Sequence, residues 1–308
     1  MTRHFDNLSA LGPGGVTSIL DLSDELKQKR GASDPYKKSL EGKQVALVFE
    51  KSSTRTRLSL EVAVNELGGK AIVLTSNGSQ MGRGEPMSDT ARVLGRMVHG
   101  ITMRTSDESR LQTMMKMSGV PVLNALTDQS HPMQILADLQ TVRAHFKTLD
   151  QLKFCWIGDG NNMASSWIEA AGLLGLKLRL ACPSGFEPNP KEVAQACKAG
   201  ADVQVMNSPI DAIRDAHVVS TDVFASMGQE AETQARLKAF EGFMLDAQLL
   251  SHADKKAVVL HCLPAHRGEE ISEEVLEGPQ SLVWDEAEAR LHTSKALLLW
   301  AFGVHDLK

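Results

Sequence analysis

Cysteine is scarce in this sequence, and its spacing excludes a C-x-x-C redox pair and a zinc finger. The 308 residues include four cysteines, which form no C-x-x-C pair and no zinc-finger spacing. Such usage favours a reducing compartment over secretion. The N-terminal residues also lack the apolar core of a signal peptide, and no apolar run approaches the length of a membrane span. We therefore expect a cytoplasmic protein without a bound metal or a membrane partner.

An excess of positive charge is missing as well. The formal net charge of −5 argues against a nucleic acid or an anionic membrane surface as partner. The sequence has no internal repeat of fixed period and no low-complexity segment. With 42% hydrophobic and 23% charged residues, a chain of this length is expected to form about two ordinary globular domains.

Short apolar runs alternate with helical patterns along the whole chain. The runs lie at 44–49, 70–74, 99–103 and 120–124, and then at 153–157, 177–181, 202–206, 217–221, 257–261 and 281–285. This alternation predicts an α/β protein with two doubly wound domains, each a parallel sheet flanked by helices. We place the first domain at 1–145 and the second at 146–286. The glycine-rich stretch 77–88 is predicted to be a projecting loop.

The stretch Glu50–Leu58 contains the strongest chemical signal. It follows the apolar run at 44–49 and precedes apolar residues at helical spacing, so it turns a strand into a helix. Free backbone N–H groups, hydroxyl groups and two guanidinium groups then converge on one spot, which suits a phosphate-like dianion. It is not a Walker loop, because the sequence has no G-x-x-x-x-G-K-[ST]. The alternative interpretation is a helix N-cap with two solvated arginines.

Six motifs occur in order along nearly the whole chain. They are Lys51–Arg57, Gln80–Arg92, His131–Gln134, Gly158–Asn162, Asp222 with Ser226–Gly228, and His261–Pro264. Together they resemble the ornithine carbamoyltransferases of the aspartate/ornithine transcarbamylase family. The chain departs from the family's pattern at Ser52, where proline is frequent, and at Met133, where cysteine is frequent. Neither departure removes a hydrogen-bond donor that the site would need.

The resemblance implies an activity and an assembly. The expected reaction transfers the carbamoyl group of carbamoyl phosphate to the side-chain amine of L-ornithine, giving L-citrulline and phosphate without a cofactor. A role in arginine biosynthesis is favoured by the compact length, while a role in arginine breakdown stays open. By the same resemblance, a C-terminal helix at 287–308 returns to complete the first domain. The loop that carries Gln80 would project into a neighbouring subunit of a cyclic homotrimer with shared active sites.

The resemblance also assigns residues to carbamoyl phosphate. Arg104, His131 and Thr56 would donate hydrogen bonds to the carbonyl oxygen, where such donors stabilise the developing oxyanion. Without the resemblance, Arg104 reads as an exposed arginine, and Arg290 as the partner of Glu286 four residues earlier. The full carbamoyl phosphate set is Ser53, Thr54, Arg55, Thr56, Gln80, Arg104, His131, Gln134 (to the carbamoyl nitrogen), Cys262, Leu263 (through its carbonyl) and Arg290.

The second substrate presents an acid–base problem. A side-chain amine of this type has a pKa of about 10 and is almost wholly protonated at neutral pH. The resemblance makes Cys262 and Asp222 the candidates near that nitrogen, with Cys262 as a proton acceptor. With Arg104 and His131 they form the expected catalytic set. By residue type alone, Cys262 would be a buried thiol. The expected ornithine-binding set is Asn162, Asp222, Ser226 and Met227.

Three other functions deserve comparison with this one. Gly158–Met163 follows a strand and opens a helix, as in an NAD-dependent dehydrogenase, but Met163 replaces the third glycine and 180–183 contain no acidic residue for a ribose. A pure binding module would not need polar groups on two domains. Within the transcarbamylases, putrescine or N-acylated ornithine are alternative substrates, whereas Asp222 with Ser226–Gly228 favours free ornithine.

Overall fold

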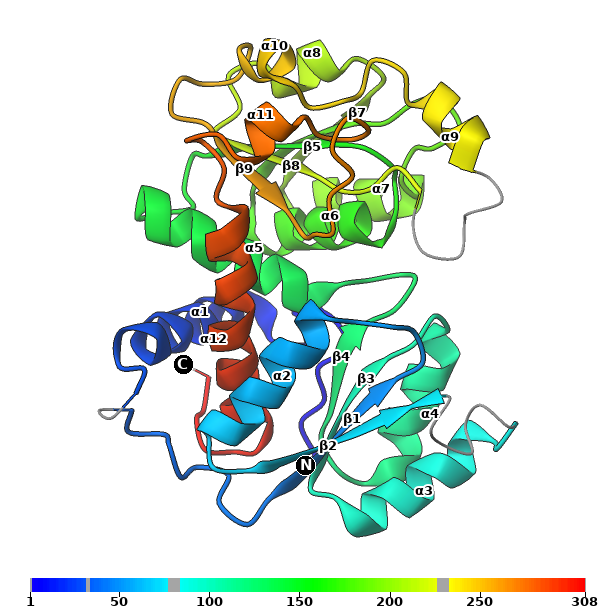
Figure 1. Cartoon of the computed structure of the whole chain (residues 1–308), viewed down its shortest axis with the longest axis vertical. Helices are drawn as coiled ribbons and strands as arrows, with labels where there is room; N and C mark the ends of the chain where they lie inside the picture. Colours follow the sequence, from blue (N-terminus) through cyan, green and yellow to red (C-terminus); the bar gives the residue numbers. More distant parts are fainter. Residues whose placement is uncertain (1, 32–33, 77–83, 226–232, 308) are drawn as a thin grey trace. The chain divides into compact units, whose positions relative to one another are not determined.

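The apolar runs of the sequence become the strands of two parallel sheets, one in each of two units of the chain. The computed structural model describes residues 2–31, 34–76, 84–225 and 233–307. One unit comprises 1–140 with 288–308, and the other comprises 141–287. The predicted fold class, two parallel sheets flanked by helices, is confirmed (Figure 1). The domain boundary predicted at 145/146 and the one at 140/141 both fall inside helix α5 (Pro132–Phe146).

The sheet of the first unit has the strand order β2–β1–β3–β4, and all its pairings are parallel. Its strands are β1 (Gln44–Phe49), β2 (Lys70–Thr75), β3 (Gly100–Arg104) and β4 (Val122–Leu126). Its helical elements are η1 (Leu8–Ala10), α1 (Gly12–Gln28), α2 (Arg55–Glu66), α3 (Met87–Met97), α4 (Glu108–Ser118), most of α5, and the larger part of α12 (Val283–Ala301).

Helices cover both faces of this first sheet. On one face, Ala46, Val48 and Met103 pack against apolar residues of α3 and α4. Helices α1, α2 and α12 lie on the opposite side (Figure 1). Burial on both faces explains why β1 reads as an unbroken apolar run, which is the usual pattern of a central parallel strand.

The sheet of the second unit has the order β7–β6–β5–β8–β9 and is also parallel throughout. Its strands are β5 (Lys153–Ile157), β6 (Lys177–Ala181), β7 (Asp202–Met206), β8 (Val218–Thr221) and β9 (Val258–His261). Its helices are α6 (Asn162–Leu174), α7 (Pro190–Lys198), α8 (Pro209–Ile213), α9 (Thr233–Ala239), α10 (Ala247–Leu250) and α11 (Glu273–Leu276).

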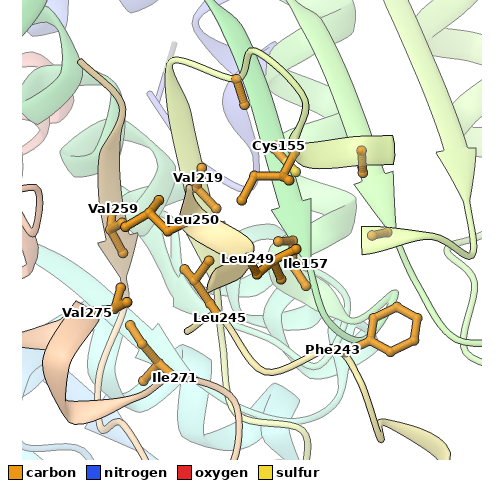
Figure 2. Packing of buried hydrophobic residues seen from close by; sticks show 14 of the residues in the cluster. Cys155, Ile157, Val219, Phe243, Leu245, Leu249, Leu250, Val259, Ile271 and Val275 are labelled. Carbon is orange, nitrogen blue, oxygen red and sulfur yellow. The ribbon is translucent and has the colours of Figure 1, made fainter. Parts of the chain in front are cut away.

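The core of the second unit lies between the central strands and the short helices that cover one face of the sheet. Cys155, Val219 and Val259 of neighbouring strands pack against Leu249 and Val275 of α10 and α11 (Figure 2). The other face is covered in part by α6, from which Trp167 packs against Phe154, with ring centroids 5.4 Å apart. This continuous packing holds the carboxyl ends of β5, β8 and β9 at fixed positions.

One prediction about local structure is wrong, and the end of one predicted loop is misplaced by two residues. The run 281–285 is not a strand. Only Ser281 forms an isolated bridge, with Val259, and helix α12 begins at Val283. A short apolar run of this kind fits the start of a buried helix as well as a strand, and the helical pattern that follows it decides the outcome. In the stretch 77–88, positions 77–83 lie outside the described residues, and the last two residues, Met87 and Ser88, begin α3.

In each unit the strand order reverses beside the first strand, and ligands of open α/β sheets bind outside the carboxyl ends of strands at such a switch point. The switch lies between β1 and β3 in the first unit and between β5 and β8 in the second. Register aligns Phe49 with Arg104 in the first sheet, and Ile157 with Thr221 in the second. None of the described helices has the length and apolar character required to cross a membrane.

Candidate active-site residues

The predicted anion-binding residues meet at the switch point of the first unit. Ser53 and Thr54 form the turn after β1, and helix α2 begins at Arg55. Thr54 occupies the N-cap position but makes no side-chain capping bond. The first N–H groups of a helix lack intrahelical partners, so the start of α2 presents donors and a positive dipole end to an anion.

Three arginines near this turn differ in their surroundings. The guanidinium of Arg104, at the end of β3, donates a hydrogen bond of 3.0 Å to the hydroxyl of Ser53. Arg55 is half-buried, and no ion pair or side-chain hydrogen bond within the described part of the chain engages its guanidinium. Arg57, by contrast, is exposed and pairs with Glu61 at 3.4 Å. Of the two guanidinium groups predicted to converge on the anion, that of Arg57 is therefore paired with Glu61, whereas that of Arg55 has no such pair within the described residues.

Arg290 joins the same group of residues from the C-terminal helix α12. It is almost fully buried, and it donates hydrogen bonds to the hydroxyl of Thr56 at 2.8 Å and to the side-chain oxygen of Gln134 at 2.7 Å. The amide nitrogen of Gln134 donates to the carboxylate of Asp138 at 2.8 Å. These partners fix the orientation of the Gln134 amide. Asp138 was not predicted as a site residue, although its i+4 spacing from Gln134 on a helix indicates that the two side chains are neighbours.

His131 lies at the start of α5 and is buried. Burial lowers the pKa of its imidazole well below 6.5, and the positive charges of Arg290 and Arg104 lower this pKa further. His131 is consequently neutral near pH 7, so one ring nitrogen carries a proton for donation while the other can accept. A neutral donor beside two arginines suits an uncharged carbonyl oxygen that gains negative charge during a reaction.

Polar residues of the second unit gather at its own switch point. Asp222 follows β8 and is buried, and Cys262 follows β9. The thiol of Cys262 donates to one carboxylate oxygen of Asp222 at 3.1 Å. The side-chain amide of Asn161 donates to the other oxygen, with a nitrogen–oxygen distance of 3.4 Å. The carboxylate therefore joins the ends of three strands.

The two asparagines at the start of α6 have different positions. Asn161 is the N-cap, and its side-chain oxygen accepts from the N–H groups of Met163 and Ala164. The predicted ornithine ligand Asn162 is the first helical residue and is half-buried. The sequence analysis missed Asn161, although asparagine is among the preferred N-cap residues.

The glycine-containing loop after β5, which resembles a dinucleotide site, packs against the protein's own backbone. A Cβ atom at Gly160 would lie 2.3 Å from the backbone nitrogen of Pro188, so the chain approaches too closely for any side chain. The buried guanidinium of Arg236 pairs with Asp159 and donates to the carbonyl of Phe224 at 2.6 Å. Burial raises the pKa of Asp159, Arg236 opposes this, and nearby Asp222 adds to the rise. Local packing therefore explains Gly160.

Asp222, His261 and Cys262 also place one oxygen, one nitrogen and one sulfur within 4.8 Å of one another. Such a donor set can suit a soft or borderline metal ion. In this fold, however, both ring nitrogens of His261 take part in hydrogen bonds, one with the N–H of Leu263 and the other with Glu270. A metal ligand at His261 would first have to displace one of these partners.

Three of the predicted site residues, Gln80, Ser226 and Met227, lie outside the described residues. The remaining predictions fall into two sets. The first unit contains Ser53, Thr54, Arg55, Thr56, Arg104, His131, Gln134 and Arg290, and the second contains Asn162, Asp222, Cys262 and Leu263.

Comparison with known proteins agrees with this arrangement. The profile described as the aspartate/ornithine carbamoyltransferase carbamoyl-P binding domain matches residues 3–144, and the profile of the Asp/Orn binding domain matches residues 150–301. The ornithine carbamoyltransferase of Geobacter metallireducens is 51% identical over 300 residues, which are 97% of this chain and 98% of that protein.

Solved structures give the same result. The ornithine carbamoyltransferase from Pyrococcus furiosus has a TM-score of 0.93 at 40% identity and covers 99% of this chain and 98% of its own. An anabolic ornithine carbamoyltransferase from Campylobacter jejuni has a TM-score of 0.92 at 39% identity, covering 98% of this chain and 100% of its own. The chain therefore belongs to the aspartate/ornithine carbamoyltransferase family.

Proposed function

We propose that this protein transfers the carbamoyl group of carbamoyl phosphate to the side-chain amine of L-ornithine, releasing L-citrulline and phosphate. The observation that carries the proposal is the group of Ser53, Thr56, Arg104 and Arg290 around the start of helix α2, in a chain of this family. It combines amide donors, hydroxyl groups and guanidinium groups, which is the set that a phosphate dianion requires.

In the first unit, the N-terminus of α2 with Ser53, Thr54 and Arg55 would hold the phosphate. Arg104, His131 and Thr56 would donate to the carbonyl oxygen, and each such donor is typically worth about 3 kcal/mol of transition-state stabilisation. The oxygen of Gln134 accepts from Arg290 and has a second lone pair, which suits the carbamoyl nitrogen. Arg290 thus supports both the hydroxyl of Thr56 and the amide of Gln134.

In the second unit, Asp222 and Cys262 would receive the amine. The neutral amine nitrogen attacks the carbonyl carbon to form a tetrahedral intermediate. The bond from that carbon to the phosphate oxygen then breaks, so that phosphate leaves with the electron pair and takes up the second proton that the attacking nitrogen loses. The amine must lose a proton for this attack. The thiol of Cys262 donates to Asp222 at 3.1 Å, so the pair can accept the proton, and by resemblance Cys262 would lie near the amine.

Free ornithine is favoured over putrescine and over N-acylated ornithine. Buried Asp222 offers a carboxylate to an α-ammonium group, which an N-acylated ornithine lacks. The start of α6, with Asn162, offers a positive dipole end to an α-carboxylate, which putrescine lacks. By resemblance, Ser226 and Met227 would bind this same amino-acid end. An assay that compares the three amines for carbamoylated product and phosphate tests the proposal, and turnover of putrescine or N-acetylornithine in preference to ornithine would reject it.

We place the reaction in arginine biosynthesis, supported by the similarity to an anabolic ornithine carbamoyltransferase. Expression of this chain should restore growth without arginine to a host that lacks the corresponding transferase. The Cys262→Ala variant serves as the matched negative control. Failure of the wild-type chain, despite ornithine turnover in vitro, would favour the breakdown direction.

We further propose a cyclic homotrimer in which Gln80 serves the active site of a neighbouring subunit. A cyclic interface is heterologous, with the same loop meeting the same body around the ring. Mixing the inactive variants Gln80→Ala and Cys262→Ala should restore activity, because each mixed trimer then contains one interface between an intact loop and an intact body. Mixed trimers that form by mass spectrometry and stay inactive would reject shared sites.

A further inference from the structure

His261 belongs to one of the family motifs but has no part in the proposed chemistry. It is the last residue of β9 and is fully buried, and its own N–H donates to the carboxylate of Glu286 at 2.8 Å. Its side chain turns back to the backbone that follows. The N–H of Leu263 donates to the Nδ1 atom of His261 at 2.9 Å, which closes a tight loop around Cys262.

The loop needs such a closing bond because Leu263 has an unusual backbone conformation. Its φ of +56° lies in the left-handed region, which residues with a β-carbon rarely adopt. A residue in this region is retained only where surrounding contacts determine it. The hydrogen bond to His261 is such a contact, and it acts on the residue directly after Cys262.

The bond from Leu263 also decides which nitrogen of His261 is protonated, and a second hydrogen bond uses that proton. Since Nδ1 accepts from Leu263, the proton of a neutral ring lies on Nε2, which donates to Glu270 at 3.0 Å. Glu270 is fully buried and accepts a further bond from the N–H of His266 at 2.6 Å, while its carbonyl accepts from Leu245 at 2.9 Å. Glu270 is thus anchored on both sides and holds the imidazole in one orientation.

We infer that His261, oriented by Glu270, is a positioning residue that aims the thiol of Cys262 at Asp222 through its hydrogen bond to Leu263. The expected effect on ornithine turnover rests on the proposed function. The orientation of the Cys262 thiol rests on geometry alone. The thiol lies 3.1 Å from Asp222 only while the loop from His261 to Leu263 keeps its shape. Displacements of about 1 Å in such groups can reduce a rate by roughly 10²-fold.

Two matched substitutions separate positioning from packing. In His261→Asn, the side-chain oxygen replaces Nδ1 and can still accept from Leu263, while the bond to Glu270 is lost. In His261→Gln, the longer amide reaches Glu270 but leaves the N–H of Leu263 without its acceptor. We expect kcat/KM for ornithine to fall by about 10²-fold in the Gln variant, and by less than about tenfold in the Asn variant. The dissociation constant for carbamoyl phosphate should change by much less than kcat/KM in both, because most residues expected around this ligand lie outside the loop from His261 to Leu263.

A readout independent of catalysis accompanies the kinetics. The rate of alkylation of Cys262 by iodoacetamide is measured in a Cys197→Ser background, because Cys197 is exposed whereas Cys155 and Cys182 are buried. We expect the rate to change in His261→Gln and to stay near the parent value in His261→Asn. If the wild-type chain does not carbamoylate ornithine, the proposed function fails, while the alkylation rates still test the role of His261.

Glu270→Leu gives an answer even if His261→Gln does not fold, because it removes the acceptor for Nε2 and keeps the imidazole. Unlike the shorter amide in His261→Asn, the imidazole can then rotate away from Leu263. We therefore expect lower kcat/KM for ornithine and an altered alkylation rate, with a much smaller change in carbamoyl phosphate affinity. Equal losses in His261→Asn and His261→Gln would overturn the inference, as would losses matched by weaker carbamoyl phosphate binding. Unchanged kinetics and alkylation in Glu270→Leu would overturn it too.

Discussion

The two units use the same topological position for opposite electrostatics. At the switch point of the first unit, Arg104 and Arg290 surround a helix start, and their charges help to lower the pKa of His131, after burial. At the switch point of the second unit, Asp222 lies beside Asp159, and it adds to the rise that burial causes in the pKa of Asp159. One parallel-sheet edge therefore suits an anion and the other suits an amine. Similar architecture accordingly sets where a ligand binds, while a few side chains at strand ends set its charge.

The largest expected effect tests the positive half of this comparison. Arg55→Ala should lower kcat/KM for carbamoyl phosphate by about 10³-fold, because a charge-assisted donor to the anion is lost. Arg57→Ala is the matched control, since Arg57 lies on the same helix but is exposed and paired with Glu61. Isothermal titration with carbamoyl phosphate measures the affinity. Equal affinities in the two variants would show that Arg55 does not belong to the site. A changed alkylation rate of Cys262 would show that the sites of the two units are not separate.

The next effect concerns stability in the first unit alone. Lys295 is fully buried and pairs with Asp34 and with Glu66. Lys295→Met leaves the buried carboxylate of Asp34 without its cation, whereas Glu66 keeps Arg30 at 2.8 Å. We therefore expect a loss of about 3 kcal/mol in the free energy of unfolding, the low end for buried pairs. The exposed pair of Lys29 and Glu25 provides the control, since Lys29→Met should leave the free energy of unfolding nearly unchanged.

Hydrogen exchange then assigns this loss to a unit. Peptides from 34–66 and 288–301 should lose protection in Lys295→Met, whereas peptides from the sheet of the second unit should keep it. Equal loss in both sheets would contradict independent stabilisation of the two units.

A third prediction tests the proposed amine site of the second unit. Ornithine carries a protonated amine near neutral pH, so its Michaelis constant should fall as the pH rises from about 6 to about 8.5. Cys262→Ser should lower kcat/KM for ornithine by about 10²-fold and alter this profile, because a group in proton transfer is replaced. Carbamoyl phosphate affinity should change by much less than kcat/KM, and Cys197→Ser should behave as wild type. A Michaelis constant that does not vary with pH in the wild-type protein would contradict the proposal.

The smallest effect is a pH dependence of stability. Between its lowered folded pKa and the unfolded value near 6.5, His131 binds a proton only in the unfolded chain, so stability falls as the pH drops below about 6.5. Burial lowers the pKa of His292 and of His4 in the same sense. His131→Gln should therefore reduce the slope of unfolding free energy against pH by up to about 1.4 kcal/mol per pH unit, without abolishing it. The exposed residue His252 supplies the control, His252→Gln, and identical slopes in the two variants would contradict this role.

The strands were predictable because burial on both faces of a parallel sheet leaves unbroken apolar runs, as in β1 and β5. The meeting of Ser53 with Arg104 follows from the same logic, since parallel strands end at one edge. The prediction of a strand at 281–285 was wrong because apolar periodicity cannot distinguish a short strand from the start of a buried helix.

Other features needed the three-dimensional structure. Sequence alone could not choose between Asn161 and Asn162 as the N-cap, because both are asparagine. Nor could it give the orientation of the Gln134 amide, which depends on Asp138 on its own helix and on Arg290 from the far end of the chain. Contacts between residues so distant in sequence leave no local pattern to detect.

The bond between Arg290 and Thr56 spans 234 positions of the sequence. A ribosome synthesises the chain from its N-terminus, so the turn after β1, the end of β3 and His131 are all made long before Arg290. A nascent chain that has folded its first sheet would present the anion-binding turn without the guanidinium that holds Thr56 and Gln134. Full affinity for carbamoyl phosphate then arises only once Arg290 has been synthesised, so the order of synthesis delays ligand binding until the second unit has also been made.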